Sequence, residues 1–243
     1  MVAMKAIVLG GTGAVGQQIV KYLKKCDEFI SIRLISRRTI DIGEDIGSEK
    51  IARYFSIIFE QRVIDFDAID THLDDFKDAD VVFCALGTTR GKSGAKGFYK
   101  VDHDYVVGCA KACHEAGVQH FSLVSSSGAN EDSSFLYPKT KGQTEREVRE
   151  LGFKRCTIAR PGLLEHRNAD FRVLEILGQV LLLPIKLLGS KRFSVPVDVV
   201  AKAMIYDSLS ENKEAVTVIE NSELYDQAKH FEEIPSIRSA RSA

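Results

Sequence analysis

GGTGAVG, at residues 10–16, is the stretch that decides the fold. It follows an apolar run at residues 5–10 (KAIVLG) and opens an amphipathic run at residues 13–25. Between a strand and a helix, glycines spaced G-x-G-x-x-G permit a tight turn and a close approach of the backbone to a pyrophosphate at the positive helix end. A glycine-rich turn without a ligand is the alternative, but this setting favours a dinucleotide site. The expected contacts are Gly10, Gly11, Thr12, Gly13, Ala14, Val15 and Gly16.

Short apolar runs alternate with amphipathic stretches along the chain. Besides residues 5–10, we expect strands at 31–36, 61–66, 80–86, 120–126, 155–160 and 215–220. Their near-continuous Val, Ile, Leu and Phe is typical of strands buried on both faces. Between them, residues 104–117 and 139–152 have helical spacing and end at a glycine suited to a left-handed cap.

This alternation predicts an α/β fold, a doubly wound parallel sheet of the NAD(P)-binding Rossmann type. A chain of 243 residues with 44% hydrophobic residues is large enough for one such core. We therefore expect a single NAD(P)-binding domain over residues 1–243. Within it we expect a cofactor half at 1–160, a substrate-side segment at 161–220 and a loose tail at 222–243.

Composition and charge argue against several other classes of protein. The formal net charge of -1 and the pI near 6.6 give no electrostatic reason to expect direct nucleic-acid binding or a general anionic membrane partner. The five cysteines are an odd number, and a chain of this length does not need disulfide bonds for stability. They therefore indicate a reduced, intracellular protein. Cys109, Cys113 and His114 have a spacing that suggests a metal site, but no second ligand pair accompanies them. We interpret these thiols as small buried hydrophobes and expect no metal.

No targeting signal or transmembrane helix is expected. The first residues, MVAMKAIVLGG, lack the basic start and the cleavage site of a secretion signal. The most apolar later stretch, residues 177–189, is interrupted by Pro184 and Lys186 and is too short to span a bilayer. It fits a core segment or a lid first, and a dimer or membrane-surface contact second.

The second expected strand ends in Ser36-Arg37-Arg38. In this fold an acidic residue at that point hydrogen-bonds the ribose 2′-hydroxyl of NAD, whereas an arginine fork matches a 2′-phosphate. Arg37 and Arg38 therefore predict a preference for NADP(H), with a solvated basic turn as the alternative. Asp65, at the end of the third expected strand, is placed either to reach the adenine amino group or to cap the following turn.

GTTRGKSG, at residues 87–94, looks like the phosphate loop of nucleoside triphosphatases. That loop has five steps between its glycines, whereas Gly87 and Gly91 are only four apart. The segment also follows the fourth expected strand, while a better phosphate loop follows the first. We interpret it as backbone that passes close to a dinucleotide. The chain has no H-R-D or D-F-G set either, so a kinase is not expected.

A second group of polar residues follows the fifth expected strand. Ser125, Ser126 and Ser127 close that strand, and Tyr137 and Lys141 lie four apart, on one face of a helix. A nearby ammonium stabilises a phenolate and lowers a tyrosine pKa from its reference value of about 10, which makes the phenol a usable acid or base. Y-x-x-x-K alone is common on exposed helix faces. Downstream of a dinucleotide loop and a serine-ended strand, the catalytic interpretation is favoured.

Several motifs together carry a family resemblance. GGTGAVG, the spacing from SSS (125–127) to YPKTK (137–141), and RPG (160–162) resemble the short-chain dehydrogenase/reductase superfamily over nearly the whole chain. More closely, residues 81–106 with HFSLVSSSGAN (120–130), FLYPKTKG (135–142) and FSVPV (193–197) are similar to the Tat-interactive-protein oxidoreductase family, an atypical branch of that superfamily.

The resemblance implies roles for individual residues. Tyr137 would be the proton donor or acceptor, Lys141 would bind the nicotinamide ribose and tune Tyr137, and Ser126, or as second choice Ser125, would orient the substrate. Where many superfamily members carry an asparagine that supports a proton relay, this chain has Asp102. Further cofactor contacts implied by the resemblance are Leu86, Gly87, Thr88, Thr89 and Arg90 after the fourth strand, and Pro161, Gly162 and Leu163 against the nicotinamide.

The expected function is that of an NADPH-binding reductase, which transfers a hydride to a small-molecule carbonyl substrate while Tyr137 donates the proton. The resemblance also implies an alternative, a cofactor-loaded regulatory protein with partners in nuclear transport, transcription or apoptosis and little turnover. We expect a cytoplasmic protein, with nuclear or peripheral membrane association as the alternatives. The substrate and the oligomeric state do not follow from sequence patterns.

Overall fold

Seven parallel strands form the centre of the molecule, in the order β3-β2-β1-β4-β5-β6-β9. The computed structural model describes residues 3–39, 57–88, 90–165, 193–211, 214–235 and 237. The strands of the central sheet are β1 (Met4–Leu9), β2 (Phe29–Ser36), β3 (Ile58–Val63), β4 (Val81–Cys84), β5 (His120–Val124), β6 (Arg155–Arg160) and β9 (Val216–Glu220). The predicted doubly wound parallel sheet is confirmed.

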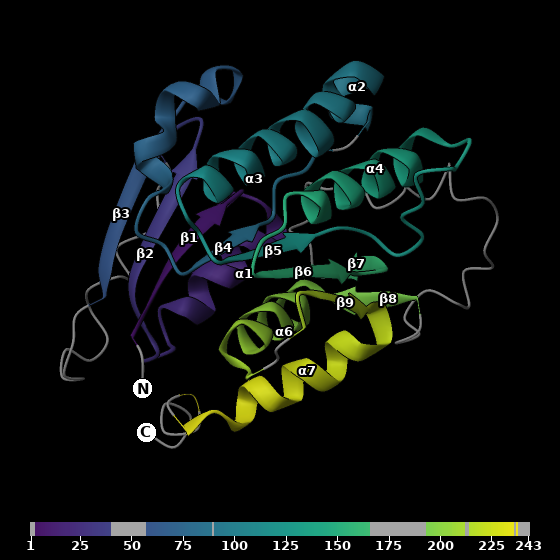
Figure 1. Cartoon of the computed structure of the whole chain (residues 1–243). Helices are drawn as coiled ribbons and strands as arrows, with labels where there is room; N and C mark the ends of the chain where they lie inside the picture. Colours follow the sequence, from purple (N-terminus) through teal and green to yellow (C-terminus); the bar gives the residue numbers. More distant parts are fainter. Residues whose placement is uncertain are drawn as a thin grey trace.

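Helices cover both faces of this sheet (Figure 1). One layer consists of η2 (Phe66–Phe76), a distorted 3-10 segment, with α3 (Tyr105–Glu115) and α4 (Leu136–Glu150). The other consists of α1 (Ala14–Leu23), α6 (Val197–Leu209) and α7 (Asn221–Glu233). Two short helices lead into α3, namely α2 (Arg90–Tyr99) and η3 (Lys100–Asp104). A small second sheet pairs β7 (Leu163–Glu165) with β8 (Ser194–Pro196).

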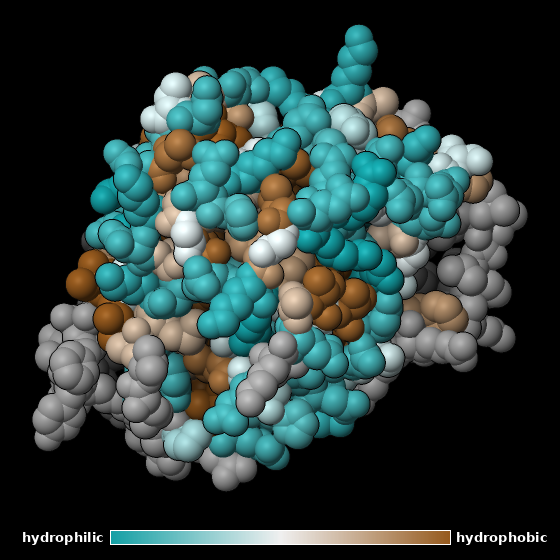
Figure 2. Space-filling view, in the orientation of Figure 1, coloured by the Kyte–Doolittle hydropathy of each residue, from teal (hydrophilic) through white to brown (hydrophobic). Residues whose placement is uncertain are grey.

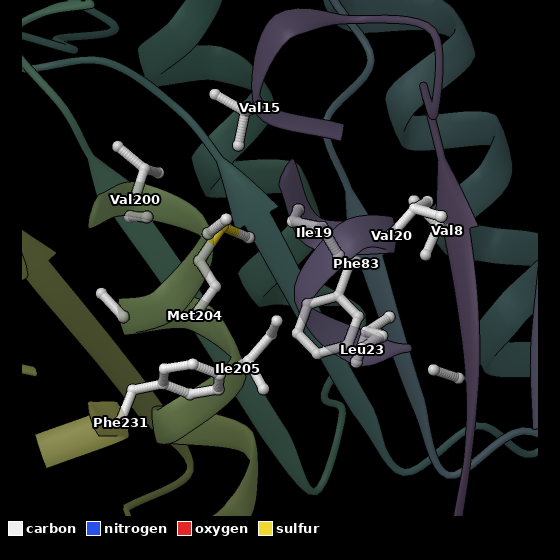
Figure 3. Packing of buried hydrophobic residues seen from close by; sticks show 14 of the residues in the cluster. Val8, Val15, Ile19, Val20, Leu23, Phe83, Val200, Met204, Ile205 and Phe231 are labelled. Carbon is white, nitrogen blue, oxygen red and sulfur yellow. The ribbon is translucent and has the colours of Figure 1, made fainter. Parts of the chain in front are cut away.

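The two helix layers enclose two hydrophobic cores. Figure 3 shows the core between the sheet and the layer of α1, α6 and α7. There Ile19 and Leu23 of α1 lie one helical turn apart and pack with Phe83 of β4. All three side chains are fully buried. Each such side chain contributes roughly 1.5–3 kcal/mol relative to an exposed position. On the outer surface of the described residues, hydrophilic side chains cover most of the face in view (Figure 2). This division is what amphipathic helices on a buried sheet produce.

Most expected elements are present, and the predicted left-handed caps are confirmed, since Gly117 and Gly152 have φ of 82° and 74°. The third strand begins and ends three residues earlier than we expected, at Ile58–Val63. The prediction of a loose tail at 222–243 is wrong for α7, which extends to Glu233. A capping box between Glu220 and Glu223 starts that helix, and Leu224, Ala228 and Phe231 bury one face of it.

The five cysteines lie in the interior as free thiols. Cys109 and Cys113 of α3 are fully buried, which confirms their interpretation as small core residues. Burial raises the pKa of both thiols well above the ordinary value. They therefore stay protonated and unreactive at neutral pH.

A buried polar cluster joins the start of β5 to β6 and α6. The Nε2 atom of His120 lies 2.9 Å from the hydroxyl of Thr157, which donates to the Asp207 carboxylate at 2.6 Å. Burial, together with the charge of Arg155, lowers the pKa of His120 to about 3. The folded protein therefore holds this histidine in its neutral form.

This arrangement predicts a dependence of stability on pH. Between about pH 6.5 and 3 the unfolded chain binds a proton on His120 that the folded protein does not, so the free energy of unfolding falls as pH falls. The expected slope from this group is about 1.4 kcal/mol per pH unit. Urea unfolding of wild type and of His120→Gln from pH 6.5 to 4 gives two slopes, and their difference is the contribution of His120. The raised pKa of Asp207 acts in the opposite direction, but Asp207 is present in both proteins. Equal slopes in the two proteins would contradict the assignment, and the exposed His230→Gln provides the control.

Candidate functional site

The candidate site lies where the order of the strands reverses. From β1 the chain proceeds to β2 and β3 on one side, and then crosses to β4 on the other. The loops that follow β1 and β4 therefore leave the sheet side by side, at the edge where ligands bind in folds of this type. The backbone N–H of Ala85, after β4, donates to the carbonyl of Leu9 at 2.9 Å and holds the two loops together.

The glycines at 10–16 are required by close backbone contacts. Gly10 has φ of 80°, and a Cβ there would lie 2.5 Å from the carbonyl oxygen of Ala85. A Cβ on Gly16 would lie 2.2 Å from the carbonyl oxygen of Gly10. The N-cap of α1 is Gly13, which has no side chain to cap the helix, and the first turn holds no acidic residue. The first N–H groups of α1 and its positive end thus suit a pyrophosphate, and these residues fit the expected dinucleotide.

The two predicted arginines lie just beyond the end of β2. Arg37 and Arg38 are both exposed, and the Ser36 hydroxyl donates to the carbonyl of Arg38 at 2.6 Å. Asp65 is the N-cap of η2, where its carboxylate accepts the N–H of Asp67 at 2.9 Å. Of the two alternatives for Asp65, capping is the one that the structure contains.

Tyr137 stands at the open end of α4. It is the second residue of the helix, is 39% exposed, and stacks on Phe98 with the ring centroids 5.5 Å apart. Lys141 lies one turn further along the same helix and is buried. Its Nζ atom is 2.7 Å from Oδ1 of Asp102, in η3. The predicted helical pair is therefore present, with an accessible phenol and a buried ammonium.

The two candidate serines have different surroundings. Ser125 is buried, and its hydroxyl donates to Oε1 of Glu145 at 2.5 Å. Ser126 is half-buried, and its hydroxyl donates to the neighbouring carbonyl of Ser127 at 3.2 Å. The hydroxyl of Ser125 is thus held in the protein interior, while that of Ser126 is the more accessible of the two.

The segment after β6 joins the central sheet to the small one. The carbonyl of Pro161 accepts the N–H of Ser127 at 2.8 Å, and Gly162 N–H donates to Asn221 Oδ1 at 2.6 Å. A Cβ on Gly162 would lie 2.3 Å from the carbonyl oxygen of Phe193, so glycine permits the contact with the β8 side. Leu163 then begins β7. These contacts place Pro161 beside Ser127, in the loop that follows β5.

The loop after β4 runs from Leu86 through Thr88 into α2. The Thr88 N–H donates to Oδ2 of Asp102 at 2.7 Å. Thr89 lies outside the described residues, and of Arg90 only the backbone, at the start of α2, is described. Residues 90–99 are helical apart from Gly94, which has φ of 68°. Residues 90–94 of GTTRGKSG therefore belong to α2.

Two positions near these side chains were not identified as site residues from the sequence. Glu145 is fully buried on α4 and binds Ser125, Arg149 and Arg160. Its position one helical turn beyond Lys141 was the one available signal. Phe98, which stacks on Tyr137, belongs to a stretch with no apolar periodicity to mark it.

A parallel sheet with a glycine loop at the point where the strand order reverses defines a Rossmann-type nucleotide-binding protein. A family model described as NAD(P)H-binding matches residues 10–205. The chain is 34% identical to Protein HTATIP2 of Rattus norvegicus, over 91% of this chain and 88% of that protein. It is 35% identical to "Protein FMP52, mitochondrial" of Meyerozyma guilliermondii, over 94% of this chain and 97% of that protein. The chain therefore belongs to the NAD(P)H-binding family and, within it, to the Tat-interactive-protein family that its motifs indicated.

Solved structures with little sequence identity share the fold. The UDP-Glc/GlcNAc 4-epimerase of Campylobacter jejuni superposes with a TM-score of 0.66 at 17% identity, covering 92% of this chain and 82% of that one. MoeE5 in complex with UDP-glucose and NAD gives 0.64 at 14% identity, with 95% and 82% covered. In the described residues, none of the helices has the length and apolar character needed to cross a bilayer. The predicted cytoplasmic location is not confirmed, and the name of the fungal relative includes the word mitochondrial.

Proposed function

We propose that this protein is an NADPH-dependent reductase of a small carbonyl compound. The observation that carries the proposal is the pair on α4, in which the Tyr137 phenol is accessible and the buried Lys141 ammonium lies one turn behind it. A phenol in such a place can donate a proton to a substrate oxygen. Its stacking on Phe98 restricts where the ring can lie.

The residues that would hold the cofactor come from four loops at one edge of the sheet. The glycine loop would bind the pyrophosphate, and Arg37 and Arg38 the 2′-phosphate. The segment 86–90 would line the cofactor after β4, and the segment 161–163 would lie against the nicotinamide. When bound, NADPH supplies a hydride to the carbonyl carbon. Lys141 would contact the nicotinamide ribose. Ser126 would orient the carbonyl oxygen towards Tyr137, since the Ser125 hydroxyl is already bound to Glu145.

NADPH consumption with a panel of aliphatic, aromatic and quinone carbonyl compounds tests this function. We expect at least one of them to increase the rate above that of the protein with NADPH alone. If NADPH binds but no carbonyl increases its consumption, the reductase proposal fails. The regulatory alternative, with protein partners, then becomes the better account.

The preference for NADPH has its own test in Arg37→Asp. Hydrogen bonds to a charged group contribute about 1.5–3 kcal/mol, so we expect a loss of about ten- to hundredfold in NADPH affinity. NADH lacks the 2′-phosphate, so its affinity should change less than about threefold. Titrations followed by nicotinamide fluorescence measure both constants. Lys21→Asp, with the same change of charge in the last turn of α1, is the control. Equal losses for both cofactors would contradict the assignment.

A further inference from the structure

The carboxylate of Asp102 connects two parts of the proposed site that are far apart in the sequence. Asp102 lies in η3 and is 2% exposed. Its Oδ1 atom is 2.7 Å from Nζ of Lys141, and its Oδ2 atom accepts the Thr88 N–H at 2.7 Å. Its backbone carbonyl also accepts the hydroxyl of Thr144 at 3.0 Å. Asp102 is thus bound both to α4 and to the loop after β4.

Close packing above the carboxylate fixes its position. A Cβ added to Gly87 would lie 3.2 Å from Oδ1 of Asp102, so the loop passes directly over the carboxylate at a glycine. The neighbouring Thr88 N–H holds the second oxygen. With both oxygens engaged and the backbone carbonyl bonded to Thr144, the side chain has little freedom to turn away.

The electrostatics of Lys141 depend on this carboxylate. The ionisable groups that act on the ammonium are Asp102 from η3, Tyr137 from its own helix and Cys84 from β4. Burial is the largest single influence and lowers the pKa of Lys141, but Asp102, Tyr137 and Cys84 together more than offset it, with Asp102 the largest of the three, so the pKa is raised. Because a buried ammonium without a counter-charge tends to lose its proton, Asp102 is what keeps Lys141 charged.

We propose that Asp102 is a positioning residue, whose carboxylate holds the Lys141 ammonium beneath the Gly87–Thr88 loop and in register with Tyr137. An asparagine could keep the hydrogen bond to Thr88 but would supply no charge. In this chain the aspartate therefore acts as the counter-ion of the lysine. The catalytic role of Lys141 rests on the proposed function, whereas the coupling of Asp102, Lys141 and the loop is a property of the chain itself.

Asp102→Asn in the cofactor-free protein tests the coupling directly. Titration of lysine side chains labelled with carbon-13 at Cε, with the Lys141 signal assigned from Lys141→Arg, reports the protonation of this ammonium. We expect the Lys141 midpoint to fall by about one to three pH units in Asp102→Asn. It should stay in place in Asp74→Asn, which removes an exposed carboxylate with an equally short ion pair, 2.6 Å from Lys77. An unchanged Lys141 midpoint in Asp102→Asn would overturn the proposal.

A second measurement applies even if the single variant folds poorly. Removing one member of a buried ion pair strands the other, whereas removing both does not. We therefore expect the double variant Asp102→Asn/Lys141→Met to have a higher Tm than Asp102→Asn alone. A double variant that is no more stable than Asp102→Asn would refute the pairing. Neither readout requires turnover. A protein that binds NADPH without reducing a carbonyl would therefore contradict the proposed function, while these two measurements would still decide the role of Asp102.

Discussion

Tyr137→Phe is expected to lower the rate of carbonyl reduction by about 10²–10⁴-fold, which is the usual contribution of a positioned acid. The change removes one oxygen atom and keeps the ring that stacks on Phe98. Because Tyr137 is 39% exposed, we expect the free energy of unfolding to change little. NADPH affinity should also be nearly unchanged, so the loss should lie in kcat.

Steady-state kinetics with the best carbonyl compound of the panel would measure this effect. Tyr206→Phe, a similar change on α6 where the ring stacks on His230, is the matched control and should keep full activity. A Tyr137→Phe protein that consumes NADPH as fast as wild type would exclude this residue as the proton donor. A titration showing that the variant still binds NADPH would establish that the loss of activity is not a loss of cofactor binding.

Glu145→Ala is expected to reduce the free energy of unfolding by about 3–5 kcal/mol, as is usual when one partner of a buried ion pair is removed. The carboxylate is fully buried and accepts hydrogen bonds from Ser125, Arg149 and Arg160 at 2.5 to 3.0 Å. Alanine would leave two guanidinium groups without this counter-charge. Arg160 retains its contact with Glu220 at 2.9 Å, at a more exposed position.

Urea unfolding monitored by circular dichroism provides the measurement. Glu150→Ala is the matched control on the same helix, because Glu150 is 65% exposed and pairs with Arg146 only at 3.8 Å. Exposed pairs of this kind contribute at most about 1 kcal/mol. If the two substitutions cost the same, Glu145 does not hold the ends of β5, β6 and α4 together in the way that its contacts indicate.

Much of the fold could be predicted from the sequence, because a parallel sheet leaves a strong local signal. Strands buried on both faces are continuous apolar runs, and the strand at 155–160 was predicted at its full length. The edge strand β3 was misplaced because it pairs only with β2 and exposes Ile58 and Val63. The α7 helix was missed because Ala228 forms part of its buried face and gives little apolar signal.

Part of the site could be predicted from residues close together in the sequence, and part depends on contacts between distant segments. The glycine loop and the pair Tyr137 and Lys141 follow from spacing within one turn or one helix. Nothing local distinguishes Ser125 from Ser126, since only the fold shows that one hydroxyl meets a buried carboxylate. The contact between Asp102 and Lys141 joins two helices and depends on tertiary packing.

The most direct test of the proposed reductase function is the transfer of deuterium to the carbonyl compound from NADPH that carries deuterium at both C4 positions. Wild-type protein, the labelled cofactor and the best aldehyde or ketone of the panel would be incubated, and the product analysed by mass spectrometry. The proposal predicts one deuterium on the former carbonyl carbon, with the label coming from one face of the nicotinamide. NADPH that binds at the glycine loop but leaves the product unlabelled, or no alcohol product at all, would contradict it.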